Sequence, residues 1–351
     1  MFKRILVLLL CVCLCMAVGC SKEPEQQLSV EMGDDVSAPE PPPAPEPKFS
    51  VNPLTGLEDL EIGKEKDRPV AVTINNISIA QPVQTGLGKA DIVYETEVEG
   101  GITRLVALFQ DISKVEKIGT VRSARYAFID LAMGHNAIYV HHGQDVTHAG
   151  PHLKDLDHFV VSENNAGARV SNGLSREHTL YAYGDKLWDQ LEKQFKTENS
   201  NTDTWVNFAT AEEEIHLENT ANAVSVPFSN SYKTTFKYDS ESGKYVRYFN
   251  GTLRKDYITG EKVAFKNIFV LSTDIYTYPN CNDGYKHKKV ELDSGSGYYI
   301  VNGTYTVISW RKGSASNSFV FTTVDGSELT VEPGNSWVCI PNGQTAIPVF
   351  E

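Results

Sequence analysis

Histidine and arginine side chains gather in one stretch of the sequence. Seven of the nine histidines lie within 44 residues, and three arginines precede them. Arginine binds phosphate and carboxylate groups through paired hydrogen bonds, and histidine exchanges protons near neutral pH. A cluster of such groups predicts a binding or catalytic site. The histidines are His135, His141, His142, His148, His152, His158 and His178, and the arginines are Arg104, Arg122 and Arg125.

Two of these arginines stand where a helix is predicted to begin. The apolar spacing predicts a helix from Ser123 to Asn136, with Arg122 and Arg125 at its start. Because unpaired N–H groups and the dipole at a helix start favour an anion, we expect both arginines to bind one, together with Arg104 and His141.

A structural role for Arg125 is the alternative. Its guanidinium would then pair with Glu95, Glu97 or Glu99 of a neighbouring strand, while Arg122 would lie on the surface.

The same stretch also permits a hydrolase or phosphotransferase. His141 or His142 would act as the general base, Asp130 or Glu95 would orient it, and the arginines would stabilise developing negative charge. On a strand, His141 and His142 would point to opposite faces and could not share one pocket. The sequence has no GxSxG motif for acyl transfer.

The predicted ligand-binding set combines these groups. A metal site at His148, His152 or His178 is conceivable, but these histidines lack ligand-type spacing, so we predict no metal and no cofactor. The set consists of Arg104, Arg122, Arg125, His141, His142, His178, Glu95, Glu99 and Asp130.

Strands and helices must position these side chains. Short runs rich in Val, Ile, Tyr and Thr predict strands at 69–76, 91–100, 102–111 and 137–143, with a hairpin turn at Gly100 and Gly101. A second helix is predicted from Leu180 to Phe195. From about Ala223 onward, turn signals recur and helical periodicity fades. We therefore expect an α+β protein: a mixed α/β domain at 51–220 followed by a mostly β domain at 221–351.

The N-terminus predicts export and lipidation. Lys3 and Arg4 precede an apolar run that is too short to span a bilayer, which favours a cleaved signal at 1–19. The sequence Ala17-Val18-Gly19-Cys20 resembles a lipobox, so Cys20 is the predicted lipidation site. The alternative is an ordinary secretory signal with an incidental cysteine. We expect an extracytoplasmic protein, anchored by lipid to the outer face of the cytoplasmic membrane.

The composition predicts a disordered tether and argues against a nucleic-acid partner. Residues 20–50 comprise Cys20 and a proline-rich, acidic segment that is predicted to be disordered. The whole chain of 351 residues has a formal charge of −13, so no nucleic-acid partner is expected. Cleavage after residue 19 would make the charge −15, because Lys3 and Arg4 leave with the signal. Cys281 and Cys339 could form a disulfide or remain thiols.

Several motifs carry a family resemblance. In the N-terminal half they are NPLTGL (52–57), RPVAVTINN (68–76), GLGKADIVYETEVEGGITRL (86–105), IGTVRSAR (118–125) and YVHHG (139–143). In the C-terminal half they are YDSESGKYVRYFNG (238–251), TGEKVAFKNIFV (259–270) and LTVEPGNSWV (329–338). Together they resemble the YerB-type lipoprotein family, also called DUF3048. The resemblance implies an extracytoplasmic two-domain lipoprotein of unassigned activity, without established catalytic residues.

Two positions depart from the pattern of that family. An acidic residue is typical where this chain has Asn75, and a proline is typical where it has Glu177, in the sequence REHTLY. These departures weaken any role for a carboxylate at position 75.

Three functions remain open from the sequence. A binding module would hold an anionic envelope component, such as a teichoic-acid phosphate, a lipid pyrophosphate or a peptidoglycan carboxylate. An enzyme would use the histidine base described above. A scaffold would bind a protein partner without any ligand.

Overall fold

The computed structural model describes residues 48–199, 202–210, 214–281 and 284–351. The predicted signal at 1–19, Cys20 and nearly all of the predicted tether lie outside these residues. Residues 47–351 belong to one compact unit. Among the described residues, no helix has both the length and the apolar character needed to cross a membrane.

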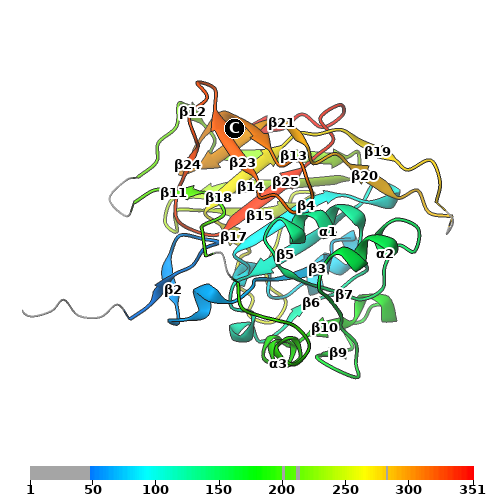
Figure 1. The fold of residues 1–351 in the computed structure, drawn as a ribbon. Coiled ribbons are helices and arrows are strands. Elements are labelled where there is room, and N and C mark those ends of the chain that lie inside the picture. The colour runs from blue at the N-terminus through cyan, green and yellow to red at the C-terminus, as the bar shows by residue number, and fades with distance from the viewer. Residues whose placement is uncertain (1–47, 200–201, 211–213, 282–283) are drawn as a thin grey trace, which may run out of the picture. The chain divides into compact units, whose positions relative to one another are not determined.

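A large sheet is the main element of the described region (Figure 1). Its strand order is β12, β22, β21, β18, β25, β4, β5, β3, β7, β8, and β23 also pairs with β22. The bounds are β3 (Val70–Asn75), β4 (Ile92–Glu97), β5 (Thr103–Phe109), β7 (Ile138–His141), β8 (His158–Val160), β12 (Asn219–Thr220), β18 (Asn267–Leu271), β21 (Ser294–Val301), β22 (Thr304–Arg311), β23 (Val320–Thr323) and β25 (Ser336–Ile340).

The four strands predicted in the N-terminal half are confirmed as β3, β4, β5 and β7. Strands β4 and β5 form the predicted antiparallel hairpin. Gly100 and Gly101 turn the chain there with φ angles of 73° and 68°, which glycine adopts without steric cost. This turn places Glu99 beside the end of β4.

Strands from both halves of the chain share the large sheet. β25 pairs in parallel with β4 through Trp337 opposite Val93 and Val338 opposite Tyr94. Strand pairing therefore continues across the boundary expected near residue 221.

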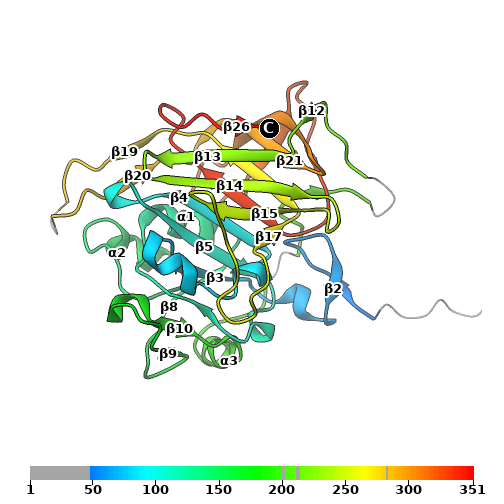
Figure 2. The same cartoon turned by 180° about the vertical axis from the view of Figure 1, so that it is seen from behind.

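A second sheet packs against the first (Figure 2). Side chains alternate along β4, so that Val93 joins a core cluster with Phe236 and Trp337, while Tyr94 joins a separate cluster with Phe128. The second sheet comprises β16 (Thr252–Leu253), β15 (Lys244–Phe249), β14 (Tyr232–Asp239), β13 (Ala223–Ser229), β26 (Val349–Phe350) and β17 (Ala264–Phe265).

Three α-helices, all in the N-terminal half, are present among the described residues. They are α1 (Tyr126–Met133), α2 (Ala149–His152) and α3 (Gly184–Gln194). Figure 1 shows α1 and α2 on one side of the large sheet. The prediction of a helix from Ser123 was three residues early, and α3 begins later than the predicted Leu180.

Nine short strands lie outside the two main sheets in the described region. Leu180 lies in β10, which pairs with β6 and β9, and these hydrogen bonds prevent the helix from starting there. The C-terminal half is mostly β, as predicted. The short strands are β1 (Ser50–Val51), β2 (Glu58–Leu60), β6 (Ile118–Gly119), β9 (Gly167–Arg169), β10 (Leu180–Ala182), β11 (Asn207–Phe208), β19 (Ile275–Thr277), β20 (Lys288–Val290) and β24 (Thr330–Val331).

The two cysteines of the described region are free thiols. Cys339 is buried in β25, and Cys281 is partly exposed.

Candidate functional site

Glu99 is the centre of the first charged cluster. Arg125 donates from Nε to Glu99 Oε2 at 2.8 Å, and its Nη2 also contacts Glu99 Oε1. Arg104 donates from Nη2 to the same Oε1 at 3.4 Å. One carboxylate is thus shared by two guanidinium groups, which matches the salt-bridge alternative for Arg125, with Glu99 as its partner.

The electrostatics of this cluster keep it ionised. Burial alone would raise the pKa of Glu99, but the hydrogen bond from Arg125 and the charges of Arg104 and Arg125 lower it to about 2. Burial, with the neighbouring charge of Arg125, lowers the pKa of Arg104 to about 9. Arg104 is 3% exposed, and its Nη1 and Nη2 already donate to the Ser123 carbonyl and to Glu99.

The start of α1 differs from the predicted one. Arg125 is the N-cap residue of α1, and no side chain caps the helix. The carbonyl of Ser123 instead accepts a hydrogen bond from Arg104 Nη1 at 3.0 Å. The prediction that Ser123 caps the helix is therefore wrong. At the predicted anion site, Arg104 and Arg125 already bind local acceptors.

A hairpin from the C-terminal half adjoins the Glu99 cluster. His287, between β19 and β20, lies with Nδ1 3.5 Å from Glu99 Oε2 and with Nε2 3.5 Å from Asp145 Oδ1. The backbone N–H groups of Thr147 and His148 also donate to Asp145. No sequence signal identified His287, because its neighbours in the chain are not those of the histidine-rich stretch.

Arg122 belongs to a different cluster. Its Nη1 donates to the carbonyl of Glu177 at 2.9 Å, and its Nη2 donates to Glu177 Oε2 at 3.2 Å. Its Nε is buried and has no acceptor. Arg122 and Arg125 thus share no partner, contrary to the expectation that they bind one anion together.

Two further arginines lie beside Arg122 in this cluster. Arg169 donates from Nη2 to His142 Nε2 at 3.1 Å, and Arg176 donates from Nη2 to Glu163 Oε1 at 2.7 Å. Arg169 Nε is 3.0 Å from the same Glu163 oxygen, but without hydrogen-bond geometry. The sequence did not single out either arginine, because both lie late in the histidine-rich stretch, outside any recognisable motif and away from the predicted helix start. We call this group the arginine edge; it comprises Arg122, His142, Arg169, Arg176 and His178.

His178 lies between the two positions that depart from the family pattern. Asn75 Nδ2 is 2.9 Å from His178 Nδ1, and Glu177 Oε1 is 3.5 Å from His178 Nε2. Burial lowers the pKa of His178. The carboxylate beside this histidine therefore comes from position 177, and an amide occupies position 75.

His141 and His142 have separate surroundings, although His142 lies beyond the strand on which both were expected. His141 donates from Nδ1 to the carbonyl of Gly143 at 2.7 Å, and its Nε2 lies 3.1 Å from His158 Nδ1. His142 lies just beyond the end of β7 and donates from Nδ1 to the carbonyl of Val161 at 2.7 Å. Both rings engage both nitrogens, and burial lowers the pKa of His141 to about 4. Because both nitrogens of each ring already have a partner, neither histidine is well placed to act as a general base.

Glu95 lies in the core and not in a ligand site. It is fully buried, and its face of β4 points toward the second sheet and away from α1. Burial raises its pKa, and the charge of Arg247, 4.0 Å away, acts in the opposite direction. The donors to its carboxylate are Asn76 Nδ2, Thr103 Oγ1, Thr234 Oγ1 and Trp337 Nε1.

Asp130 also differs from its predicted role. Its Oδ1 lies 2.7 Å from His152 Nε2, and the His152 ring stacks on Tyr126 with the centroids 4.1 Å apart. Asp130 therefore orients His152 and neither His141 nor His142. Across the described residues, no group of three or more His, Cys, Asp or Glu side chains is arranged to hold a metal ion.

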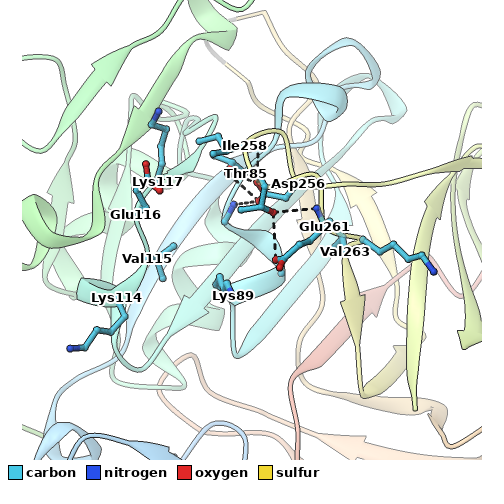
Figure 3. A pocket seen from close by; sticks show the side chains of 14 residues that line it. Thr85, Lys89, Lys114, Val115, Glu116, Lys117, Asp256, Ile258, Glu261 and Val263 are labelled. Carbon is cyan, nitrogen blue, oxygen red and sulfur yellow. Dashed lines mark hydrogen bonds between the residues drawn. The ribbon is translucent and has the colours of Figure 1, made fainter. Parts of the chain in front are cut away.

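A pocket of about 200 Å³ lies between segments from the two halves (Figure 3). Asp256 fixes its geometry by accepting hydrogen bonds from Thr85 Oγ1 at 2.8 Å and from the backbone N–H of Gly86 at 2.7 Å. Val115 and Val263 contribute apolar lining. None of the predicted site residues lines this pocket.

The protein is mostly β and is built from two sheets that pack against each other. Its two charged clusters lie near strand ends of the N-terminal half. The chain belongs to the DUF3048 family of proteins of unknown function. Residues 54–199 match the N-terminal domain model of that family, and residues 224–338 match its C-terminal domain model.

A relative from Bacillus subtilis (strain 168), described as "Putative lipoprotein YerB", is 32% identical over 299 residues. The match covers 82% of this chain and 85% of the relative. The crystal structure of the YerB protein from Bacillus subtilis is similar, with a TM-score of 0.73 and 30% sequence identity. It covers 85% of this chain and 98% of the solved chain. The family resemblance expected from the motifs is therefore confirmed, and the mostly β character of the chain matches this solved structure.

Proposed function

We propose that this chain is an extracytoplasmic lipoprotein, anchored through Cys20, that binds an anionic component of the cell envelope at the arginine edge. The description of the Bacillus relative as a lipoprotein supports the anchor. The lipobox-like Ala17-Val18-Gly19-Cys20 supports Cys20 as the lipidated residue. Two acyl chains would hold the acidic protein at the membrane without help from its charge.

One observation carries the binding proposal: the cationic groups of the arginine edge outnumber its carboxylates. Among the described residues, the three arginines Arg122, Arg169 and Arg176 form ion pairs with two carboxylates, Glu177 and Glu163. The buried Nε of Arg122 lacks an acceptor, and an unfilled donor of this kind costs free energy. A phosphate or carboxylate would supply acceptor oxygens in the geometry that guanidinium groups prefer.

The Glu99 cluster supports the proposal less well. Arg104 and Arg125 already share a carboxylate, so an anion there would have to displace Glu99 from both of them. The proposed binding site is therefore the arginine edge and no longer includes Arg104, Arg125 and His141. Three residues of the set predicted from the sequence, Arg122, His142 and His178, belong to the arginine edge.

Isothermal titration tests the proposal. The mature chain in detergent is titrated with poly(glycerol phosphate), with pyrophosphate and with a peptidoglycan stem peptide that bears a free carboxylate. Arg122→Ala and Arg169→Ala should each weaken binding of the accepted anion roughly tenfold to hundredfold, because each removes charge-assisted hydrogen bonds. Arg311→Ala serves as the matched control, since Arg311 is an exposed arginine of β22.

A substitution with the opposite effect sharpens the test. Glu177→Gln removes the carboxylate that competes for Arg122 and should strengthen anion binding. Equal affinities for the wild type and all three edge variants would refute the arginine edge as the site. A loss confined to Arg125→Ala would assign binding to the Glu99 cluster. No anion binding by the wild type would favour a scaffold for a protein partner.

A further inference from the structure

Two arginines oppose each other in the second sheet. Tyr248 pairs with Leu253 and Phe249 with Thr252, and the next pair in this register is Arg247 and Arg254. The backbone N–H of Arg254 donates to the carbonyl of Arg247 at 2.9 Å. Like charges directly across a strand pair destabilise a sheet, so their juxtaposition requires compensation.

The guanidinium of Arg247 is fully buried and only partly satisfied. Its Nη2 donates to Asn76 Oδ1 at 3.2 Å, while Nε and Nη1 are buried without an acceptor. The carboxylate of Glu95 lies 4.0 Å from Nη2 and already accepts hydrogen bonds from four other side chains. Glu95 therefore provides charge near Arg247 but leaves two of its donors unfilled.

Arg254 adds a second incompletely satisfied guanidinium. Its side chain is half-buried, and its Nε is buried without an acceptor. Within the described part of the chain, no group forms a hydrogen bond or an ion pair with this side chain. Burial lowers the pKa of Arg254, consistent with a cation that lacks a counter-charge.

We propose that Arg247 and Arg254 together hold a small oxyanion, a phosphate group or a carboxylate, between the two sheets. Unfilled buried donors are costly, and an oxyanion satisfies several of them at once. The ring of Trp337 lies 4.7 Å from Arg247 Cζ and covers one face of the guanidinium, so the anion approaches in the guanidinium plane. Arg254 is the more exposed of the two guanidinium groups, because Arg247 is fully buried.

This proposed site differs from the arginine edge in its residues and in the size of the anion that it could bind. Arg247 is 0% exposed, so the proposed ligand is limited to a small free anion or the terminal group of a longer molecule. An internal phosphodiester of a polymer would be excluded, because both of its neighbouring units would have to enter the core. The proposed phosphate chemistry therefore has two sources, free phosphate or a terminal phosphomonoester.

Thermal melts of the full mature chain in detergent test the proposal. Inorganic phosphate, glycerol 3-phosphate, acetate and poly(glycerol phosphate) are compared at constant ionic strength. At about a hundredfold excess over Kd, the bound anion should raise the Tm of the wild type by several degrees. Arg254→Gln should weaken that anion roughly tenfold to hundredfold and shrink its shift, whereas Arg311→Gln should keep it. Arg122→Ala should also keep it, which separates this site from the arginine edge.

A bromide-soaked crystal of the wild type provides a readout that does not depend on variant folding. An anomalous peak within hydrogen-bond distance of Arg247 Nη1 or Arg254 Nε would support the proposal. An ordered water alone at that position, or equal phosphate and acetate shifts in the wild type and Arg254→Gln, would overturn it.

Discussion

Glu99 and Arg125 form a doubly hydrogen-bonded ion pair between the β4–β5 turn and the start of α1. Arg125 Nε lies 2.8 Å from Glu99 Oε2, and Nη2 contacts the other oxygen. The side chains are only 16% and 14% exposed. This pair links a turn of the large sheet to the helix that covers it, which makes Arg125 a structural residue.

Replacement of Arg125 tests this role. Arg125→Ala should lower the free energy of unfolding by about 3 kcal/mol, because it leaves Glu99 with fewer partners in a largely buried site. Urea denaturation measures the loss, and the exposed Arg311→Ala should change little. Affinity for pyrophosphate per folded molecule should stay the same; a large drop in affinity with unchanged stability would contradict the structural assignment.

Glu99 also predicts a pH dependence. Its pKa falls from 4.5 to about 2 on folding, so its stabilising contribution is full above about pH 4.5 and is lost as the pH falls toward 2. Glu99→Gln should therefore cost roughly 3 kcal/mol at pH 7 and progressively less below pH 4.5. Urea melts of both proteins at pH 7, 4 and 3 provide the comparison. A cost that is constant with pH would show that ionisation of Glu99 does not stabilise the fold.

For Asp91 we expect stability to change with pH in the opposite direction. Burial raises the pKa of this partly buried carboxyl from 3.8 to about 7, against hydrogen bonds from the Gln110 N–H and the Asn52 side chain. The folded state then holds more protons than the unfolded state between these values, so stability falls as the pH rises from about 4 to 7. Relative to Asp91→Asn, the wild type should lose up to about 4 kcal/mol across that range and change little above pH 7. Parallel stability curves for the two proteins would exclude this titration.

Cys20 can be tested by labelling. Cys20→Ala should abolish incorporation of labelled fatty acid and leave either an unprocessed precursor or a protein released from the membrane, because Cys20 is the cysteine that follows a small residue at the end of the apolar run. Retention of the label in this variant would rule out Cys20 as the lipidation site.

The sequence by itself determined the local elements. Alternating and continuous apolar runs predicted β3, β4, β5 and β7, because a strand places every second residue on one face. Gly100 and Gly101 predicted the hairpin, since its turn needs positive φ angles. Local signals were less accurate at helix ends: Ser123 resembled a cap, yet its carbonyl binds Arg104 and the helix begins at Tyr126.

Tertiary structure alone decided which charges meet. Arg125 had three candidate acidic partners. Glu95 faces the second sheet from within β4, whereas Glu99 lies beyond the strand, in the turn that leads to β5, where its carboxylate meets Arg125. His287 reaches the Glu99 cluster from the C-terminal half, and no local spacing encodes such a contact. Arg247 and Arg254 become neighbours only when their strands pair. Backbone periodicity is a local property, whereas the partner of a charged side chain depends on how distant segments pack.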